Sequence, residues 1–481
     1  MSKLNVAVVG GGLVGALEAC LLAKRGFSVT LFESRHDGRG EPSYYGRSIN
    51  LAISVRGISA LKRLGLEHIV QERAIPMRAR MIHNRDGKLN PIPYDPDGRC
   101  INSIERADLN NFLLDQAEQQ FKVRILFNHK LVDMSSERGE LMFRVSDNRD
   151  HQQAEVEDGR LFRYKFDLIL GCDGSRSTVR SLLARQTQFE LEQTYIEHGY
   201  LELRIDPDAS GSFRMAANYL HIWPRGQYMM IALPNKDSSF TCTLFMPFKQ
   251  LDELRANPHK GLEFFRLNFG DSVELIGPQR IRDTLAEVRA SPLISIKCKP
   301  YHFKDKVALL GDAAHAMVPF YGQGMNCGFE DCLVFDELLD KHQLGSELLH
   351  QQAAANGDTS EPRAIGCNQK LAKALEEYNE RRCPNGHSMC DLAMYNYIEM
   401  RDLVNTWSFI MRKHLDNQLY RLLANKWIPL YTMVTFSRIP VDQCVLRRRQ
   451  QDRILALSFR LAGVSLALGL GAFLWLRRPA G

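Results

Sequence analysis

The chain has 481 residues, of which 44% are hydrophobic and 25% charged, and its formal net charge is +6. This length predicts two or three domains, and the composition is that of a globular protein. No basic block is interleaved with aromatic residues, so nucleic acid is not an expected partner. The 11 cysteines contain no C-x-x-C pair, which indicates reduced thiols and neither a zinc site nor a disulfide framework.

The first elements expected along the chain form a dinucleotide-binding unit. An apolar strand at residues 5–9 is followed by a helical pattern at 13–25 and by a second strand at 28–32 that ends at Glu33. The turn after the first strand has G-x-G-x-x-G spacing, made by Gly10, Gly12 and Gly15. These glycines let a pyrophosphate approach the backbone, and the acid binds ribose hydroxyls. Because a carboxylate repels a 2′-phosphate, the unit predicts FAD or NAD here and not NADP.

Three further stretches before residue 127 are candidates for ligand contact. The loop at residues 46–54 suits passage beneath a cofactor ring, although an ordinary helix entry capped by Ser54 explains it equally well. Arg80, between apolar neighbours, is a candidate carboxylate clamp near Tyr94, but a solvated arginine on a strand is the simpler local interpretation. Arg106 precedes a predicted helix and is a candidate phosphate ligand.

A second acidic strand end follows in the middle of the chain. The apolar strand at residues 167–172 ends in Asp173 and Gly174, and the carboxyl ends of such strands are where α/β proteins place ligands. Between residues 199 and 248, several short strands rich in Tyr, Phe, Met and Ile predict an antiparallel sheet. One face of this sheet could form the wall of a pocket.

The stretch from Gly311 to Asn326 has the features of an anion-binding corner. It lies between an apolar strand at residues 307–310 and a helix expected to begin near Cys327, whose first N–H groups are free to bind a ligand. Asp312 could accept hydrogen bonds from sugar hydroxyls, and the glycines would admit a flat ligand. A helix N-cap followed by a tight turn is the alternative interpretation.

The last quarter is predicted to be helical and to end in a membrane segment. Residues 343–369 are expected to be a mobile loop, and helical periodicity follows at 371–382 and 391–414. Arginines then precede an uncharged run at residues 461–476. At about 1.5 Å per residue this run spans ~24 Å, slightly less than a ~30 Å hydrocarbon layer, and including residues 454–459 makes it long enough. A C-terminal anchor is predicted, with an interfacial or packing helix as the alternative.

Taken together, the glycine motif with Glu33, the Asp173-Gly174 pair and the corner with Gly324 and Asn326 resemble the single-component flavoprotein aromatic hydroxylases. Within that family, the similarity is strongest to members that hydroxylate L-kynurenine. It is carried by residues 46–54, 76–83, 221–224, 394–401 and 428–431. The polar stretch at about 343–369 is longer than the family leads us to expect.

The resemblance implies an α/β fold in four parts. These are a discontinuous Rossmann-like FAD-binding domain at residues 1–75, 100–185 and 296–340, an antiparallel β-sheet substrate domain at 76–99 and 186–295, a C-terminal helical region at 341–452 and a membrane-anchor segment at 453–478. It also implies bound FAD, with NADPH and O2 as co-substrates. L-kynurenine would be hydroxylated at ring carbon 3 through a flavin C4a-hydroperoxide, a step in tryptophan degradation towards NAD. Neither a catalytic side-chain base nor a metal is expected.

The family also suggests which residues contact each ligand. The amino-acid end of the substrate would be bound by Arg80, Tyr94, Asn396 and Tyr431, with Glu399 nearby on the helix of Asn396, and the ring pocket would be lined by Leu220, Phe245 and Phe320. The cofactor positions would be Gly10, Gly12, Val14, Gly15, Phe32, Glu33, Ser34, Arg35, Ala52, Arg106, Leu131, Asp173, Thr178, Asp312, Gly324, Met325 and Asn326. The tail would attach the enzyme to lipid of the mitochondrial outer membrane, with its catalytic part facing the cytosol.

Two other functions remain open from the residues alone. A flavin monooxygenase of another aromatic or quinone substrate would share the cofactor motifs, and a non-enzymatic Rossmann-type escort protein could keep the glycine motif. The sequence gives no indication of the oligomeric state.

Overall fold

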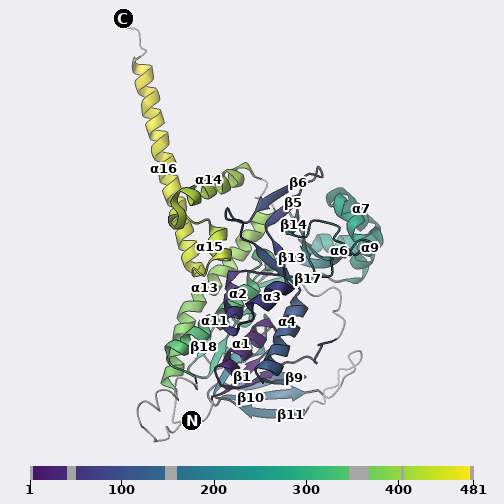
Figure 1. Ribbon diagram of the computed structural model, residues 1–481, viewed down its shortest axis with the longest axis vertical. Helices are drawn as coiled ribbons and strands as arrows, with labels where there is room; N and C mark the ends of the chain where they lie inside the picture. Colours follow the sequence, from purple (N-terminus) through teal and green to yellow (C-terminus); the bar gives the residue numbers. More distant parts are fainter. Residues whose placement is uncertain (1–3, 41–49, 147–159, 346–367, 402–405, 477–481) are drawn as a thin grey trace.

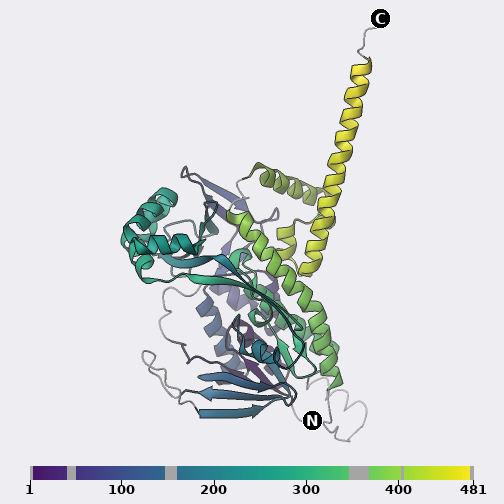
Figure 2. The ribbon, with the colours of Figure 1, turned by 180° about the vertical axis from the view of Figure 1, so that it is seen from behind.

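The computed structural model describes residues 4–40, 50–146, 160–345, 368–401 and 406–476. Figure 1 shows an elongated body in which a six-stranded sheet lies in the half nearer the N-terminus and a seven-stranded sheet lies in the other half. A long helix, α13 (Gln369–Arg401), runs along the flank of both halves, as Figure 2 shows from behind. The two sheets are therefore tied together by the C-terminal part of the chain.

The six-stranded sheet carries the glycine-rich turn. In spatial order its strands are β18 (His302–Phe303), β19 (Val307–Leu309), β12 (Leu168–Gly171), β1 (Asn5–Val9), β2 (Ser28–Phe32) and β8 (Arg124–Leu126). All neighbours pair in parallel except the edge strand β18. The central strands β12 and β19 are buried along their whole length, which explains why they read as unbroken apolar runs. Since β1, β12 and β19 are parallel neighbours, the residues after each of them meet at one edge.

Helices cover this sheet and flank its ligand edge. They are α1 (Leu13–Lys24), α2 (Val55–Leu64), α3 (Glu67–Arg73), α4 (Arg106–Asp115) with the π-helical turn η1 (Gln116–Gln120), α5 (Thr178–Leu183), α10 (Asp312–His315), the 3₁₀ turn η2 (Pro319–Tyr321) and α11 (Gly324–Lys341). α11 begins at Gly324, three residues earlier than expected. Its first turn consequently includes Met325 and Asn326, which the sequence placed in the preceding loop.

Two three-stranded sheets flank the parallel sheet. One is antiparallel and consists of β9 (His129–Ser135), β10 (Glu140–Val145) and β11 (Arg160–Lys165). The other consists of β3 (Leu51–Ile53), β7 (Ile101–Ile104) and β4 (Ile75–Met77). This second sheet lies where the chain passes from one half of the body to the other, so Leu51 and Ala52 are held beside the ligand edge.

The seven-stranded sheet is mixed rather than purely antiparallel, which corrects the sequence prediction. Its spatial order is β17 (Ser291–Lys299), β13 (Glu190–Ile205), β16 (Phe240–Pro247), β15 (Met229–Pro234), β14 (Tyr219–Pro224), β5 (Ala79–His83) and β6 (Leu89–Pro93). The pair β14 and β5 is parallel, with Leu220 opposite Arg80. The reason is that the β5–β6 hairpin comes from a distant part of the chain and joins the edge of the sheet without a tight turn to β14.

Four helices that the sequence analysis did not anticipate cover one face of this sheet. They are α6 (Phe248–Ala256), α7 (Pro258–Asn268), α8 (Gly270–Ile276) and α9 (Pro278–Glu287). Phe265 and Phe269 pack with Trp223 of β14 in a core of their own. The opposite face of the sheet packs against η2 and α13 in a second core that contains Phe245 and Phe320.

The C-terminal helices differ from the expected pattern. α13 joins the predicted helical stretch at 371–382 to the first part of the one at 391–414 and is continuous through Pro384. Buried residues on both sides of the proline, such as Tyr378 and Met389, pack the helix against the body. The single helix expected at 391–414 is instead divided between α13 and α14 (Trp407–Leu423). The 3₁₀ turn η4 (Ala424–Lys426), α15 (Leu430–Phe436) and α16 (Val441–Leu476) complete the chain.

Some predictions concern residues outside the described part of the chain. This holds for most of the stretch at 343–369 and for the first four residues of the loop at 46–54. Side chains of α16 are described as far as Leu461, so most of the predicted anchor at 453–478 lies beyond them. Within the described residues, no helix combines the length and the apolarity needed to cross a membrane.

Candidate active site

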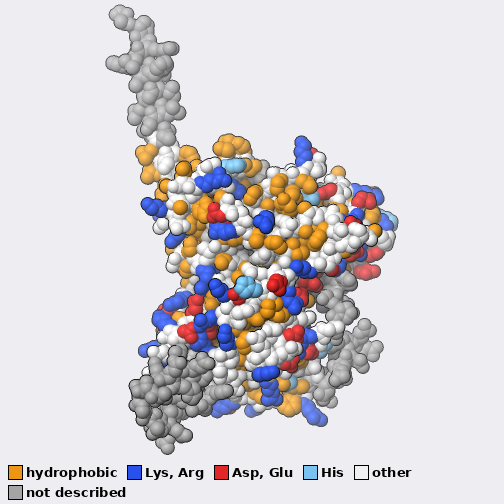
Figure 3. All heavy atoms as spheres, viewed as in Figure 1, with side chains coloured by type: hydrophobic (Ala, Val, Ile, Leu, Met, Phe, Trp, Pro, Cys, Tyr) orange, Lys and Arg blue, Asp and Glu red, His pale blue; other side chains and the backbone are white. Residues whose placement is uncertain are grey.

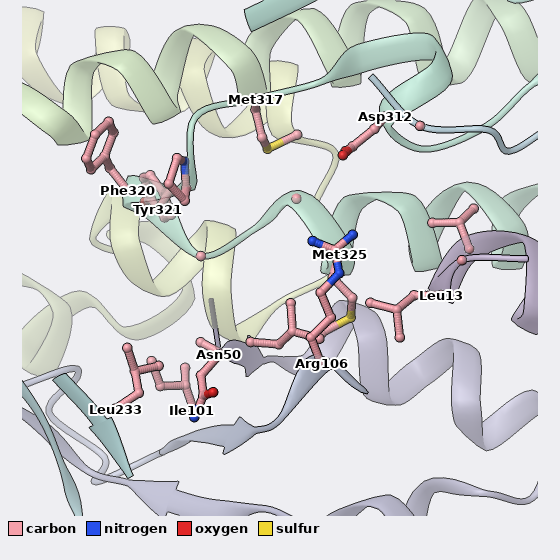
Figure 4. A pocket seen from close by; sticks show the side chains of 18 of the residues that line it. Leu13, Asn50, Ile101, Arg106, Leu233, Asp312, Met317, Phe320, Tyr321 and Met325 are labelled. Atoms are coloured by element: carbon pink, nitrogen blue, oxygen red, sulfur yellow. The ribbon is translucent and has the colours of Figure 1, made fainter. Parts of the chain in front are cut away.

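A cavity of about 350 Å³ lies at the carboxyl ends of β1, β12 and β19 and extends to the seven-stranded sheet. Figure 4 shows Asp312 and Leu13 at one end of it and Phe320 and Tyr321 at the other. Predicted residues from both ends line it: Gly10, Gly12, Val14, Glu33, Ser34, Arg35, Ala52, Arg80, Tyr94, Arg106, Asp173, Leu220, Asp312, Phe320, Gly324, Met325 and Tyr431. The fold thus brings the predicted cofactor and substrate residues into one continuous space.

The glycine turn has the close packing that a dinucleotide site requires. Gly10 has φ +111°, and a Cβ there would lie 2.5 Å from the carbonyl oxygen of Cys172. A Cβ on Gly15 would lie 1.9 Å from the carbonyl oxygen of Gly10, so this glycine closes the turn without reaching the cavity. By contrast, a Cβ on Gly12 would meet nothing within 4 Å, which leaves room for a ligand above the start of α1.

Glu33 is held in place at the end of β2. Its Oε2 accepts a hydrogen bond from the Gly11 N–H (2.8 Å), and its Oε1 accepts one from the Arg35 N–H (2.9 Å). Burial raises the pKa of Glu33, but the hydrogen bonds and charge of Arg35 outweigh this and lower its pKa overall. The carboxylate is therefore ionised and oriented, with lone pairs left for ribose hydroxyls.

Two aspartates occupy the ends of the neighbouring strands. Asp173 accepts hydrogen bonds from the Thr178 N–H (2.6 Å) and the Ser177 hydroxyl, so Thr178 supports the site through Asp173. Asp312 and Arg106 both point at the cavity in Figure 4. Burial raises the pKa of Asp312, and the positive charge of Arg106 partly offsets this. A ligand with a hydroxyl donor would satisfy the aspartate.

Asn326 fastens the start of α11 to the loop at Ala52. Its Nδ2 donates to the carbonyl oxygens of Ala52 (2.8 Å) and Gly322 (2.9 Å), and its Oδ1 accepts from the Ser54 N–H (2.8 Å). All three bonds are to the backbone, and the side chain is fully buried. Asn326 therefore shapes the wall of the cavity, while Gly324 and Met325 face the space itself.

The far end of the cavity is closed by a buried cation among tyrosines. The guanidinium of Arg80 lies over the rings of Tyr431 (5.0 Å) and Tyr94 (5.9 Å). Burial opposes the charge of Arg80, but the electron-rich groups around it, Tyr431 and then Glu399, raise its pKa overall. The Tyr94 hydroxyl is buried and has no hydrogen-bond partner among the described residues. A charged donor and an unsatisfied hydroxyl thus face the same small volume.

Apolar side chains form the walls between the two ends. Leu220 and Phe320 were predicted to lie here. The other apolar residues of the lining were not among the predicted site residues, and they are Leu13, Leu51, Ile101, Met229, Ile231, Leu233, Met317, Pro319, Tyr321 and Met400. Three of these alternate along β15, so the period-2 pattern of that strand was the available signal. Phe245 lies one layer behind and packs edge-on against Phe320 at 4.8 Å.

Five other predicted residues lie outside the lining of the cavity. Phe32 stacks on Phe143 at 4.1 Å, and Leu131 is part of the same core. Asn396 donates from Nδ2 to the Phe320 carbonyl oxygen (2.7 Å), and Glu399 lies 3.5 Å from the guanidinium of Arg80. Thr178, as described above, acts on Asp173. Their direct contact with ligand stays a prediction.

A buried ion network supports the corner after β19 and was not predicted. Asp331 accepts hydrogen bonds from the Gly311 N–H (2.8 Å) and from Arg382 Nε (2.6 Å), and it pairs with His315 Nε2 (2.6 Å). Burial lowers the pKa of His315, but Asp331 raises it overall. Although His315, Cys327 and Asp331 have potential ligand atoms within 4.8 Å of one another, Arg382 already supplies the positive charge there. The arrangement is an ion network of α10, α11 and α13.

Comparison with known proteins identifies the family. A family model described as "FAD binding domain" matches residues 3–346. Kynurenine 3-monooxygenase of Anopheles gambiae is 45% identical over 469 residues, which cover 97% of this chain and 89% of that protein. The enzyme of the same name from Sus scrofa is 44% identical and covers 97% and 91%. The solved structure of 2-methyl-3-hydroxypyridine-5-carboxylic acid oxygenase shares the fold, with a TM-score of 0.62 and 19% identity over 84% of this chain and 95% of that one. The chain therefore belongs to the kynurenine 3-monooxygenase family of flavoprotein enzymes, as its motifs predicted.

Proposed function

We propose that the protein hydroxylates L-kynurenine at ring carbon 3, with bound FAD and with NADPH and O2 as co-substrates. The observation that carries this is the position of Arg80, a buried cation flanked by two tyrosines at the closed end of a cavity whose other end fits a dinucleotide. A flavin enzyme acting on a neutral quinone or phenol would have no use for that charge. Kynurenine carries a carboxylate and an ammonium group at one end, and this end of the cavity offers Arg80 for the carboxylate, with Glu399 beside it for the ammonium group.

The residues at the open end fit FAD. Glu33 would accept from ribose hydroxyls, the start of α1 at Gly12 would face the pyrophosphate, and the start of α11 at Gly324 would face the flavin ring. When bound, FAD supplies the redox chemistry that activates oxygen for transfer to the ring. The positive end of the α11 dipole favours negative charge beside Met325.

At the closed end, the chain's own residues orient the substrate. Arg80 would bind the carboxylate by charge-assisted hydrogen bonds, and the Tyr94 hydroxyl would gain the partner that it lacks. Glu399, 3.5 Å from the guanidinium, would attract the ammonium group. Holding the amino-acid end in this way aims the aromatic ring along the cavity, and such positioning is a large part of what an enzyme contributes to a reaction between two bound groups.

The walls exclude water from the reacting atoms. Met229 and Phe320 are buried, apolar and rigidly packed in the core between the sheet and α13. Water in this space would let the activated oxygen be lost as hydrogen peroxide before it reached the ring, so the exclusion of water favours the hydroxylated product. An aniline ring is electron-rich enough to react without a side-chain base. The residues of the site therefore need only bind the substrate, orient its ring and exclude water from the reacting atoms.

The proposal is tested by kynurenine-dependent NADPH consumption. The purified protein, supplemented with FAD, is expected to be yellow and to oxidise NADPH faster when L-kynurenine is added, with 3-hydroxykynurenine formed in proportion. Kynuramine, which lacks the carboxylate, serves as the matched control and is expected to stimulate far less. Equal stimulation by both compounds, or no hydroxylated product, would contradict the proposed substrate.

The tail is proposed to anchor the protein in the mitochondrial outer membrane, with the catalytic part in the cytosol. Support comes from the uncharged run at residues 461–476 and from the arginines on both sides of it. A chain that ends at residue 453 is expected to leave the membrane fraction, while the full chain resists alkaline extraction. Recovery of both chains in the soluble fraction would refute the anchor.

A further inference from the structure

The end of the molecule from which α16 departs exposes an unusual number of large apolar side chains. Figure 3 shows hydrophobic side chains gathered there, beside the undescribed tail. They belong to two helices: Trp407, Ile410, Met411, Leu422 and Leu423 of α14, and Ile454, Leu457, Phe459 and Leu461 of α16. Trp407 is 76% exposed and Leu422 is 78% exposed. Patches of this kind mark a site of interaction.

Four of the five exposed apolar residues of α14 share one face of the helix, where they form a stripe. At 100° per residue, Trp407, Ile410, Met411 and Leu422 lie within one third of the helix circumference, together with the exposed His414 and Gln418. The opposite face is bound to the body, where Lys413 Nζ donates to the Pro93 carbonyl oxygen at 3.3 Å. α14 is therefore an amphipathic helix whose apolar face has no partner among the described residues.

A buried carboxylate fixes α14 across α16. Asp416 accepts hydrogen bonds from Arg448 Nη1 of α16 (2.9 Å) and from Trp427 Nε1 (3.0 Å). Arg412 Nη1 also pairs with Asp452 at 2.7 Å. Figures 1 and 2 both show α14 lying crosswise to α16. The apolar stripe is consequently held at a defined level, next to residues 448–452 of α16.

The sequence of α16 changes character just beyond that level. From Ile454 to Leu476, Arg460 is the sole charged residue. These residues form continuous helix, and their length of about 35 Å matches a hydrocarbon layer of ~30 Å with a small excess. If the apolar layer begins near Ile454, the surface of a bilayer coincides with the exposed face of α14.

The charges around the stripe also suit a lipid surface. The single acidic residue of α14, Asp416, is buried, whereas Arg421 and Lys426 are exposed near the C-terminal end of the helix. Arg449 and Arg453 are exposed on the adjacent part of α16. Cations around an apolar face with a tryptophan are typical of helices that lie in the membrane interface.

We propose that the exposed face of α14 lies in the interface of the bilayer, so that the protein contacts the membrane through a helix parallel to the surface as well as through its tail. The occupant of this face is lipid with anionic headgroups. This inference rests on the proposed anchoring of α16, and it adds a second contact whose loss leaves the anchor in place.

Quenching of tryptophan fluorescence by brominated lipid tests the proposal on the full chain. The probe is a vesicle of phosphatidylcholine and phosphatidylserine, brominated on the acyl chain close to the headgroup. The chain has four tryptophans, and Trp223 and Trp427 are buried, so Trp407→Phe and Trp475→Phe isolate the two remaining contributions. The Trp407→Phe variant is expected to lose a quenched component.

A charge introduced beside Trp407 provides a second test in the same quenching experiment. Ile410→Asp is expected to reduce the quenching of Trp407 several-fold and to leave that of Trp475 unchanged. The matched control is Leu161→Asp on β11, a similarly exposed leucine at the opposite end of the molecule, which is expected to change neither.

The outcomes separate this inference from the anchor. Quenching of Trp475 without quenching of Trp407 would overturn the contact of α14 while supporting the anchor. Absence of any quenching would overturn both. If Ile410→Asp instead converted a detergent-solubilised dimer into a monomer, the face would bind a second copy of the chain, and the lipid contact would be refuted.

Discussion

The guanidinium of Arg80 and the carboxylate of Glu399 lie 3.5 Å apart (Nη1 to Oε1), with only 9% and 18% of their side chains exposed. Arg80 comes from β5 of the mixed sheet and Glu399 from the last turn of α13. Their opposite charges are thus presented together at the closed end of the cavity. A zwitterionic ligand can bind such a pair with little change in net charge, which suits the amino-acid end of kynurenine.

Substitution of Arg80 should separate substrate binding from cofactor binding. Charge-assisted hydrogen bonds contribute about 1.5–3 kcal/mol, so Arg80→Ala is expected to raise the KM for kynurenine by about 10- to 100-fold. FAD content should stay unchanged, because Arg80 lies over the ring of Tyr431, and Tyr431 stacks on Tyr321 at the end of the cavity away from Asp312. Arg85→Ala is the control, since Arg85 is exposed on the turn after β5. An unchanged KM in Arg80→Ala would remove this residue from the substrate site.

Removal of the unsatisfied Tyr94 hydroxyl should affect substrate binding without lowering the stability of the protein. Tyr94→Phe removes a buried group that has no hydrogen-bond partner among the described residues, so the thermal midpoint without substrate should stay the same or rise. Substrate binding should weaken by about 1 kcal/mol, or roughly fivefold in KM. Differential scanning fluorimetry and steady-state kinetics measure the two effects. A fall in stability together with an unchanged KM would show that the hydroxyl serves the fold and not the substrate.

The sequence predicted the cofactor end of the site well for a physical reason. Each of the four residues Gly10, Glu33, Asp173 and Asp312 follows an apolar strand. Parallel pairing alone brings the carboxyl ends of these strands to one edge of the sheet, independently of the substrate domain. Comparison with known proteins confirms the family and the FAD-binding function.

The substrate end depends on contacts that local patterns do not encode. The parallel pairing of β5 with β14 joins residues about 140 positions apart and decides that Leu220 lies beside Arg80. Helix periodicity placed Asn396 and Glu399 on one face, but it could not tell that the Asn396 amide turns to the Phe320 carbonyl oxygen. The helices from α6 to α9 were not predicted, because each has only 7 to 11 residues and none gives a long periodic pattern.

The ion network below the corner at Gly311 should control cofactor retention. Arg382 is 2% exposed and bonds Asp331 and Glu330. Arg382→Met leaves these buried carboxylates with one positive partner each, His315 for Asp331 and Arg56 for Glu330, at a cost of about 3 kcal/mol. Because Asp331 also holds the Gly311 N–H, the variant should release FAD more readily.

Urea unfolding and FAD release by ultrafiltration measure both effects. Arg381→Met is the matched control, because the neighbouring Arg381 is half-exposed and pairs with Glu377 at the surface. Its stability should change by no more than about 0.5 kcal/mol. Equal behaviour of the two variants would mean that the buried network contributes nothing specific to the cofactor corner.

Glu18 should make the stability of the protein fall as pH rises. This residue of α1 is fully buried, and neither oxygen of its carboxyl group has a hydrogen-bond partner among the described residues. Burial, and then the charge of Asp336, raises its pKa well above 4.5. The folded protein therefore holds this proton while the unfolded chain releases it above about pH 4.5. The stability present below that pH is lost progressively as pH rises towards the folded pKa, by up to ~1.4 kcal/mol per pH unit.

Glu18→Gln removes the titrating group and keeps the shape of the side chain. Its free energy of unfolding, measured in urea between pH 5 and pH 8, should decline less steeply than that of the parent protein. The two curves should diverge as pH increases, with the variant more stable. Glu137→Gln is the control, because Glu137 is exposed and paired with Lys304, and its curve should run parallel to that of the parent. If Glu18→Gln also ran parallel to the parent, the buried carboxyl group would have to be ionised throughout this pH range.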